Sequence, residues 1–181
     1  MKVGITGHMS GLGKSLFDLF ENAIGFDIDN GYNIQEPIPI VEIAKTCDVF
    51  INNAYHKYCQ ADLLELMFNE WRETTKIIVN ISSVAADAPV SFDQFGFYPM
   101  HKKALDDAST RLQYAEKSCR IINIKPGWIN TPMSKDFEAD KMEPDELALE
   151  IKNIILSTNS VQSLTIGRIY FDKIKHLTKP K

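Results

Sequence analysis

Short runs of hydrophobic residues alternate with longer amphipathic stretches along most of the chain. Runs such as KIIVNIS at 76–82 and RIINIK at 120–125 are nearly continuous in apolar residues, which is typical of strands that helices cover on both faces. This pattern predicts strands at residues 2–6, 23–28, 32–34, 48–52, 76–82, 119–125 and 164–171. It predicts helices between them, at residues 12–22, 38–46, 61–72, 99–117 and 144–156. The alternation indicates an α/β protein with a Rossmann-like, doubly wound parallel β-sheet and helices on both faces.

The first predicted strand runs into the glycine-rich segment TGHMSGLGKS at residues 6–15. A phosphate-binding P-loop requires four residues between its first glycine and the Gly-Lys-Ser sequence, and that position is His8 here, so the P-loop interpretation fails on spacing. Gly7, Gly11 and Gly13 remain at a strand-to-helix turn, where a pyrophosphate can approach the backbone and the amides at the helix start attract its charge. The spacing departs from the G-x-G-x-x-G dinucleotide fingerprint, so an ordinary turn stays a second interpretation of this segment.

Composition narrows the function classes without naming a chemistry. The 181 residues are 44% hydrophobic and contain no long polar tract, which predicts one domain over residues 1–181 with a flexible basic tail at 173–181. The net charge of −4 and the scattered basic residues give no indication of a nucleic-acid groove. No hydrophobic run approaches the length that spans a membrane, and we expect no signal peptide before the first strand.

The cysteines and histidines indicate neither a disulfide framework nor a metal site. The three cysteines are an odd number without metal-ligand spacing, which predicts reduced, buried thiols in a cytoplasmic protein. Three histidines in the body of the chain also lack such spacing, so no metal is expected. The residues concerned are Cys47, Cys59, Cys119, His8, His56 and His101.

Polar or glycine-bearing segments follow the predicted strands, at the carboxyl ends where ligands bind in folds of this class. Asp27 lies 20 residues beyond Gly7, where an acidic side chain can accept hydrogen bonds from the hydroxyls of an adenosine ribose. Tyr98 and Lys102 are four residues apart at the start of a predicted helix, so both side chains lie on one helix face. The segments are TGHMSGLG, GFDIDN, YNIQ, FINNAY, NISSVAA and NIKPGWINTPM.

Five of these motifs, in order, resemble those of the short-chain dehydrogenase/reductase family, over nearly the whole chain. TGHMSGLG resembles the family's TGxxxGxG turn, NNA at 52–54 its NNAG, and ISS at 81–83 its serine strand. YPMHK at 98–102 resembles its YxxxK, and KPGWINTP at 125–132 its PGxIxTP. Single motifs match by chance, whereas five in the family's order are specific.

The resemblance implies an NAD(P)-dependent oxidoreductase that interconverts alcohols and carbonyl compounds. Tyr98 would be the general acid in reduction and the general base in oxidation, and Ser83 would hold the substrate oxygen. A phenol has an ordinary pKa of about 10, so Lys102 and the oxidised nicotinamide would have to favour the phenolate. Lys102 would also bind the nicotinamide ribose.

The resemblance also implies a cofactor site, with NAD preferred and NADP as a second option. Asp27 would accept hydrogen bonds from the ribose hydroxyls of NAD and repel the 2′-phosphate of NADP. Ser10 occupies a position at which NADP-dependent members often have an arginine or a lysine. Asn33 and Ile34 would take the place of the family's Asp-Val pair beside the adenine. The expected cofactor residues are Gly7, Met9, Ser10, Gly11, Leu12, Gly13, Asp27, Ile28, Asn33, Ile34, Asn53, Ala54, Tyr98, Lys102, Pro126, Gly127, Ile129 and Thr131.

The chain departs from the family pattern at three places. Tyr55 replaces the glycine that usually follows NNA, and the segment from Asn53 to Ile81 is shortened and lacks an early asparagine that completes the family's proton relay. Tyr55, His56 or water alone would have to replace it. Only twelve residues separate Thr131 from Pro144, where the family commonly inserts a lid, so the substrate pocket would be open or completed by a neighbouring subunit. Candidates for its apolar lining are Val84, Ala85, Val90, Phe95, Phe97, Trp128 and Met133.

Other interpretations stay open at this stage. Ser83 could merely end a strand, Tyr98 could be a packed aromatic residue and Lys102 a solvated helix residue. A dinucleotide-binding sensor without turnover would use the same fold, and Tyr55, the missing asparagine and the short lid favour it. Because the helices from Ala61 and Pro99 resemble those through which family members pair, a homodimer or homotetramer is expected.

Overall fold

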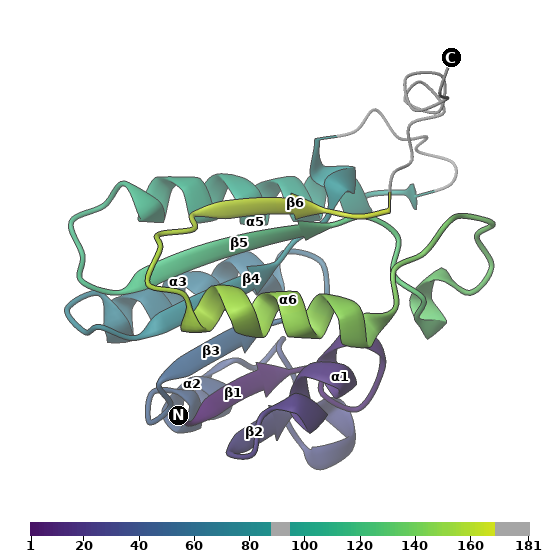
Figure 1. The fold of residues 1–181 in the computed structure, drawn as a ribbon. Coiled ribbons are helices and arrows are strands. Elements are labelled where there is room, and N and C mark those ends of the chain that lie inside the picture. Colours follow the sequence, from purple (N-terminus) through teal and green to yellow (C-terminus); the bar gives the residue numbers. More distant parts are fainter. Residues whose placement is uncertain (88–94, 169–181) are drawn as a thin grey trace.

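The computed structural model describes residues 1–87 and 95–168, and these form a parallel β-sheet of six strands (Figure 1). The strand order is β2-β1-β3-β4-β5-β6, and every neighbouring pair is parallel. The expected doubly wound α/β fold is therefore confirmed. The strands are β1 (Val3–Thr6), β2 (Ala23–Phe26), β3 (Val49–Asn52), β4 (Ile77–Ile81), β5 (Arg120–Pro126) and β6 (Ser163–Ile166).

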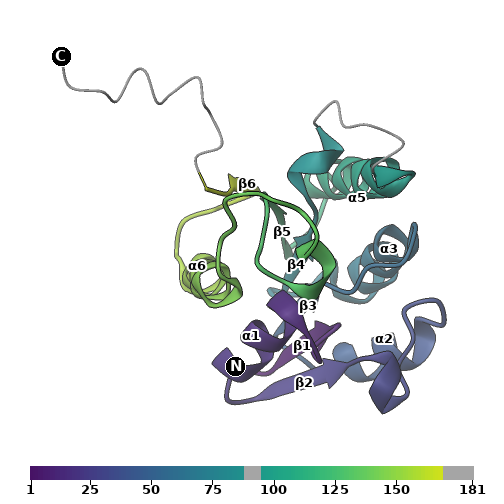
Figure 2. The ribbon, with the colours of Figure 1, turned by 90° about the vertical axis from the view of Figure 1, so that its right-hand side faces the viewer.

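Helices cover both faces of the sheet, as Figure 2 shows. Helices α1 (Gly11–Leu19) and α6 (Pro144–Leu156) pack on one face, and α2 (Ile38–Ala44), α3 (Cys59–Trp71) and α5 (Tyr98–Gln113) pack on the other. Each face has its own hydrophobic core, because a strand covered on both sides buries alternate residues in opposite directions. Along β3, Val49 and Ile51 enter the α1/α6 core, and Phe50 enters the core beneath α2 and α3.

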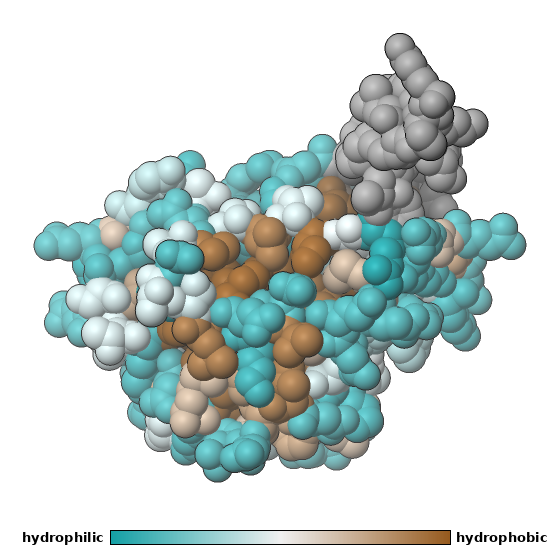
Figure 3. Space-filling model, in the orientation of Figure 1, coloured by the Kyte–Doolittle hydropathy of each residue, from teal (hydrophilic) through white to brown (hydrophobic). Residues whose placement is uncertain are grey.

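The α6 face keeps some apolar side chains partly exposed, as the space-filling view shows (Figure 3). Ile154, Leu164 and Ile166 pack against the core of this face and are only partly buried. Leu156, at the end of α6, is 60% exposed. Polar side chains surround this apolar region in the view of Figure 3.

The prediction of a short strand at 32–34 is wrong, because local hydrogen bonds close this segment into a turn. The Tyr32 amide donates to the Asp27 carbonyl at 2.8 Å, and the Asn33 side chain accepts from the Gln35 amide at 3.0 Å. Asparagine commonly bonds the backbone two residues further on, and this competes with strand pairing.

Several element ends differ from the prediction by a few residues. Helix α3 begins at Cys59 instead of residue 61, α5 ends at Gln113 instead of residue 117, and β6 ends at Ile166. Val90, the part of the expected last strand beyond residue 168, and the expected tail at 173–181 lie outside the described residues. Cys47, Cys59 and Cys119 are free thiols; Cys47 and Cys119 are buried as expected, and Cys59 is half-buried.

Within residues 1–87 and 95–168, no helix combines the length and the apolar composition that a membrane span requires. In the same part of the chain, no three His, Cys, Asp or Glu side chains lie close enough together to hold a metal ion.

Candidate active site

The glycine turn lies at the carboxyl end of β1, beside the point where the chain crosses from one side of the sheet to the other. Strand β1 pairs with β2 on one side and with β3 on the other, so the turn adjoins the topological switch point where ligands bind in open α/β sheets. A Cβ atom on Gly13 would lie 1.9 Å from the Gly7 carbonyl oxygen, so only glycine lets α1 start this close to the turn. The Ser10 side chain makes no cap hydrogen bond, which leaves the first amides of α1 available to an anion.

The NNA segment is fastened to this turn by Thr6. The Thr6 hydroxyl accepts hydrogen bonds from the backbone amides of Asn53 and Ala54, both at 2.9 Å. The Asn53 side-chain amide donates to the Thr6 carbonyl at 2.9 Å. A Cβ atom on Gly7, whose φ is +70°, would lie 3.1 Å from the backbone of Ala54. The structure thus brings the ends of β1 and β3 together into one cradle that suits the phosphates of a dinucleotide.

Asp27, Ser83 and Thr131 share one structural role, because each caps a short 3₁₀ helix at the carboxyl end of a strand. The 3₁₀ helices are Ile28–Asn30 after β2, Val84–Ala86 after β4 and Pro132–Ser134 after β5. A capping side chain accepts a hydrogen bond from a backbone amide further on, as Ser83 does from Ala85 at 3.1 Å. These caps fix three expected site residues along the edge of the sheet that carries the glycine turn.

The Asp27 carboxylate contacts the glycine turn directly. Its oxygens accept hydrogen bonds from the amides of Met9 and Asp29, both at 3.4 Å. Ile28 is 70% exposed beside it. Lys14, the basic residue that directly follows the glycine turn in the sequence, forms an ion pair with Asp18 at 2.6 Å. Asp27 therefore lies at the carboxyl end of β2 against the glycine turn, and the amine of Lys14 is engaged by another carboxylate.

The expected adenine and carboxamide residues differ in how much of them is accessible. Ile34 is 7% exposed and packs in the core beneath α2. Pro126 is buried at the end of β5, and the backbone amide of Gly127 donates a hydrogen bond to the Ile166 carbonyl at 2.8 Å. Thr131 approaches the glycine turn, since a Cβ atom on Gly11 would lie 3.1 Å from its methyl group.

Ser83, Tyr98 and Lys102 are brought together between η2, the 3₁₀ helix at Val84–Ala86, and the start of α5. Burial raises the pKa of the Tyr98 phenol, and a hydrogen bond with the Ser83 side chain acts against that rise. The Lys102 ammonium lies 5.6 Å from the centre of the Tyr98 ring, and Lys102 as a residue is only 3% exposed. Burial lowers the pKa of Lys102 to about 7, although the charge of Asp106 opposes this. Lys102 is therefore not a solvated helix residue.

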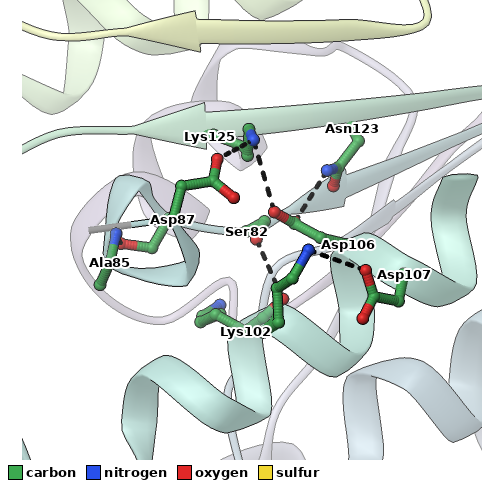
Figure 4. Close-up of polar contacts among 10 residues, drawn as sticks. Ser82, Ala85, Asp87, Lys102, Asp106, Asp107, Asn123 and Lys125 are labelled. Atoms are coloured by element: carbon green, nitrogen blue, oxygen red, sulfur yellow. Dashed lines mark hydrogen bonds and ion pairs between the residues drawn. The ribbon is translucent and has the colours of Figure 1, made fainter. Parts of the chain in front are cut away.

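A polar network fastens α5 to β5 and to η2 (Figure 4). Asn123 on β5 donates to the Asp106 carboxylate at 2.9 Å, and Lys125 forms ion pairs with Asp87 and, at 3.5 Å, with Asp106. Burial alone would lower the pKa of Lys125, but the two carboxylates raise it above its ordinary value. The network ties the loop that carries Ser83 to the helix that carries Tyr98 and Lys102.

Tyr55 contacts the Lys102 amine through its ring and directs its hydroxyl toward His101. Its hydroxyl shares a hydrogen bond of 2.8 Å with His101 Nδ1. The Lys102 ammonium lies 5.3 Å from the centre of the Tyr55 ring, and that ring meets Tyr98 edge-on with 4.9 Å between the ring centres. The bulky residue in place of the family's glycine thus forms an aromatic wall beside Tyr98 and Lys102.

The residues expected to line the substrate pocket are only partly brought together. Trp128 packs with Phe95 and Phe137, with ring centres 6.1 and 4.7 Å away, and forms an aromatic cluster next to the end of β5. Met133 is 68% exposed, and a groove of about 460 Å³ opens on the outer side of α5 beside Ala85. This groove does not include Ser83, Tyr98 or Lys102.

Gln60, which no sequence motif predicted, accepts a hydrogen bond from the Lys102 ammonium through Oε1 at 2.7 Å. A signal for it exists in the helical pattern. Gln60 lies on the same face of α3 as Leu63, Leu64 and Met67, all of which are buried. A polar residue in an otherwise apolar helix stripe requires buried hydrogen-bond partners.

No protein-family model matches the chain, and no curated protein does. Solved structures do match it. An alcohol dehydrogenase from the archaeon Thermococcus sibiricus, complexed with 5-hydroxy-NADP, is 16% identical with a TM-score of 0.73, over 100% of this chain and 99% of that one. A 3-ketoacyl-(acyl-carrier-protein) reductase from Brucella melitensis, complexed with NADH, is 18% identical with a TM-score of 0.69, over 91% and 96%. A closed form of serine dehydrogenase complexed with NADP⁺ is 13% identical with a TM-score of 0.73, over 93% and 95%. These similarities confirm the expected Rossmann-like α/β fold.

Proposed function

We propose that this protein is an NAD(P)-dependent oxidoreductase that interconverts an alcohol and a carbonyl compound. The observation that carries the proposal is the group formed by the half-buried Ser83 and Tyr98 and the buried Lys102, which lies at the same edge of the sheet as a glycine cradle suited to a dinucleotide. The fold alone would not decide function, because many activities share it. The solved structures with this fold that hold NADP⁺ or NADH add support.

The proposed chemistry assigns one role to each residue. Tyr98 donates a proton to the carbonyl oxygen in reduction and takes it back from the alcohol in oxidation. Ser83 binds the substrate oxygen, and its cap contact with Ala85 fixes the direction of the side chain. The Lys102 ammonium beside the Tyr98 ring stabilises the phenolate. A bound nicotinamide dinucleotide would supply or accept the hydride.

The dinucleotide would be held by residues around the cradle. The first amides of α1 would bind the pyrophosphate, and Asp27 would bind the adenosine ribose. Asn53, Ala54 and Thr131 would line the nicotinamide half. Lys102 would also contact the second ribose.

The experiment that tests this function is a turnover assay with a broad panel of aldehydes and ketones plus NADH, and of alcohols plus NAD⁺. We expect at least one member to change the nicotinamide absorbance at a rate proportional to protein concentration. The alternative is a dinucleotide-binding sensor, which Tyr55 favours because its ring packs edge-on against Tyr98. Tight dinucleotide binding without turnover of any panel member would support the sensor and contradict the enzyme.

NADH is expected to bind more tightly than NADPH, by about tenfold to a hundredfold, the scale of one charge-assisted hydrogen bond. The Asp27 carboxylate beside the Met9 amide would accept from the ribose hydroxyls of NADH and repel the extra phosphate of NADPH. Fluorescence titration of both reduced cofactors measures the ratio. Asp27→Asn should lose most of the discrimination, and Asp29→Asn should keep it as the matched control. Equal or tighter binding of NADPH by the unmodified protein would refute the role of Asp27.

The protein is also expected to form a homodimer or homotetramer through α3 and α5. The groove on the outer side of α5 supports this proposal, because Tyr58 and Met100 line it and are 47% and 54% exposed. Burial of such side chains against a second copy is favourable. Light scattering at micromolar concentration measures the mass, and a monomer would contradict the prediction.

A further inference from the structure

Gln60 is a buried amide whose hydrogen bonds are all directed inward. It lies in the first turn of α3 and is 2% exposed. Its Nε2 donates to the carbonyl oxygens of Asn52 at 2.9 Å and Ile81 at 3.1 Å, and its Oε1 accepts from Lys102 Nζ at 2.7 Å. The reverse orientation of the amide would set its NH₂ group against the ammonium and its oxygen against two carbonyls. The partners therefore fix which way the carboxamide points.

Neighbouring amides hold Gln60 in place from the backbone side as well. The Asn52 side chain donates to the Gln60 carbonyl at 2.7 Å and to Asn80 Oδ1 at 3.1 Å. Asn52 and Asn80 are register partners on β3 and β4, and Asn80 donates onward to Ser109 of α5 at 3.1 Å. This network joins the start of α3 to the sheet and to α5, so the Gln60 carboxamide is rigidly oriented.

The Lys102 ammonium is enclosed by two carbonyl oxygens and two aromatic rings. Besides Gln60 Oε1 it donates to the Ile81 carbonyl at 2.8 Å, and it lies over the rings of Tyr55 and Tyr98. The charged or titratable groups that face it are Tyr55, Tyr98 and, one turn further along α5, Asp106. Within residues 1–87 and 95–168 no carboxylate contacts the ammonium, so the two carbonyl oxygens provide most of the hydrogen bonding that replaces its lost water.

We propose that Gln60 is a positioning residue of the reaction, whose Oε1 keeps the Lys102 amine protonated and aligned beneath Tyr98. The proposal rests on the oxidoreductase function proposed above. Gln60 would then act in place of the relay asparagine that the chain lacks, for which the sequence suggested only Tyr55, His56 or water as replacements. Loss of this acceptor favours the neutral amine, and a neutral amine no longer stabilises the Tyr98 phenolate.

The test is a direct titration of Lys102 in the folded protein by NMR, with lysine labelled at ¹³Cε and ¹⁵Nζ and the signal assigned by its loss in Lys102→Met. In Gln60→Met, which keeps the side-chain length, we expect the pKa of Lys102 to fall by about one pH unit, because a hydrogen bond to a charged group is lost. In Gln60→Glu, which adds a negative charge at the same place, the pKa should rise. Gln113→Met is the matched control, since Gln113 also bonds two backbone carbonyls, those of Ile121 and Gln162.

Turnover supplies the second readout. For Gln60→Met we expect kcat to fall about tenfold, the equivalent of one such hydrogen bond, with KM for the carbonyl nearly unchanged and the alkaline limb of the pH profile moved to lower pH. An unchanged Lys102 titration in either folded Gln60 variant would overturn the proposal, so Gln60→Glu decides it if Gln60→Met does not fold. The titration does not depend on turnover. Absence of dehydrogenase activity would therefore refute the proposed function, whereas the effect of Gln60 on the pKa of Lys102 would still be measured.

Discussion

Tyr98→Phe is expected to lower kcat by at least about a hundredfold, the lower end of what a positioned proton donor contributes, and to leave NADH affinity nearly unchanged. The substitution removes only the phenolic hydroxyl, and the ring keeps its contacts with Tyr55 and with the Lys102 ammonium. Steady-state kinetics on a panel substrate and a fluorescence titration with NADH measure the two quantities.

The matched control for this variant is Tyr114→Phe, because Tyr114 is 80% exposed at the end of α5. It should retain full activity. A Tyr98→Phe protein that keeps most of its kcat would remove Tyr98 from the mechanism, and with it the assignment of the general acid.

Lys102→Met should lose both activity and cofactor affinity, with kcat reduced by about a hundredfold or more. The variant keeps the buried aliphatic chain and removes the charge that stabilises the phenolate and that would contact the ribose. Lys103→Met is the matched control, since Lys103 is exposed and pairs with Asp107 at 2.8 Å. Loss of kcat with unchanged NADH affinity would contradict the ribose contact, and unchanged kcat would contradict the role altogether.

The pKa of Lys102 also predicts how the rate of reduction depends on pH. Burial lowers this pKa to about 7, so the amine is charged below that pH and neutral above it. The raised pKa of Tyr98 keeps the phenol protonated across the same range. The rate of carbonyl reduction in the unmodified protein should therefore fall as the pH rises through about 7, and this limb should be absent from the residual activity of Lys102→Met.

The sequence predicted the features that depend on local pattern and on motif order. The apolar runs at 76–82 and 120–125 became β4 and β5, and the glycine spacing placed the turn between β1 and α1. Both are local properties, because buried strands need apolar runs and a tight turn needs glycine. The prediction of a strand at 32–34 failed for the opposite reason: the Asn33 side chain accepts a hydrogen bond from the backbone amide of Gln35 there, and no apolar run overrides this turn.

The environment of Lys102 could not be predicted in the same way. Gln60 is 42 residues away in the chain, and only the packing of α3 against α5 brings its amide to the ammonium. The asparagines Asn52, Asn80 and Asn123 likewise become one row only when β3, β4 and β5 pair in register. Such contacts depend on tertiary structure, whereas the sequence shows only that a polar residue interrupts an apolar stripe.

Transfer of deuterium from NADH that carries deuterium in place of both hydrogens at the nicotinamide C4 position tests the central claim most directly. If this protein is an alcohol–carbonyl oxidoreductase, the alcohol formed from a panel carbonyl will carry the deuterium on the former carbonyl carbon, as mass spectrometry can measure. The Tyr98→Phe protein should form almost none of this product under the same conditions. An alcohol without deuterium, or NADH binding with no labelled product from any carbonyl, would contradict the account.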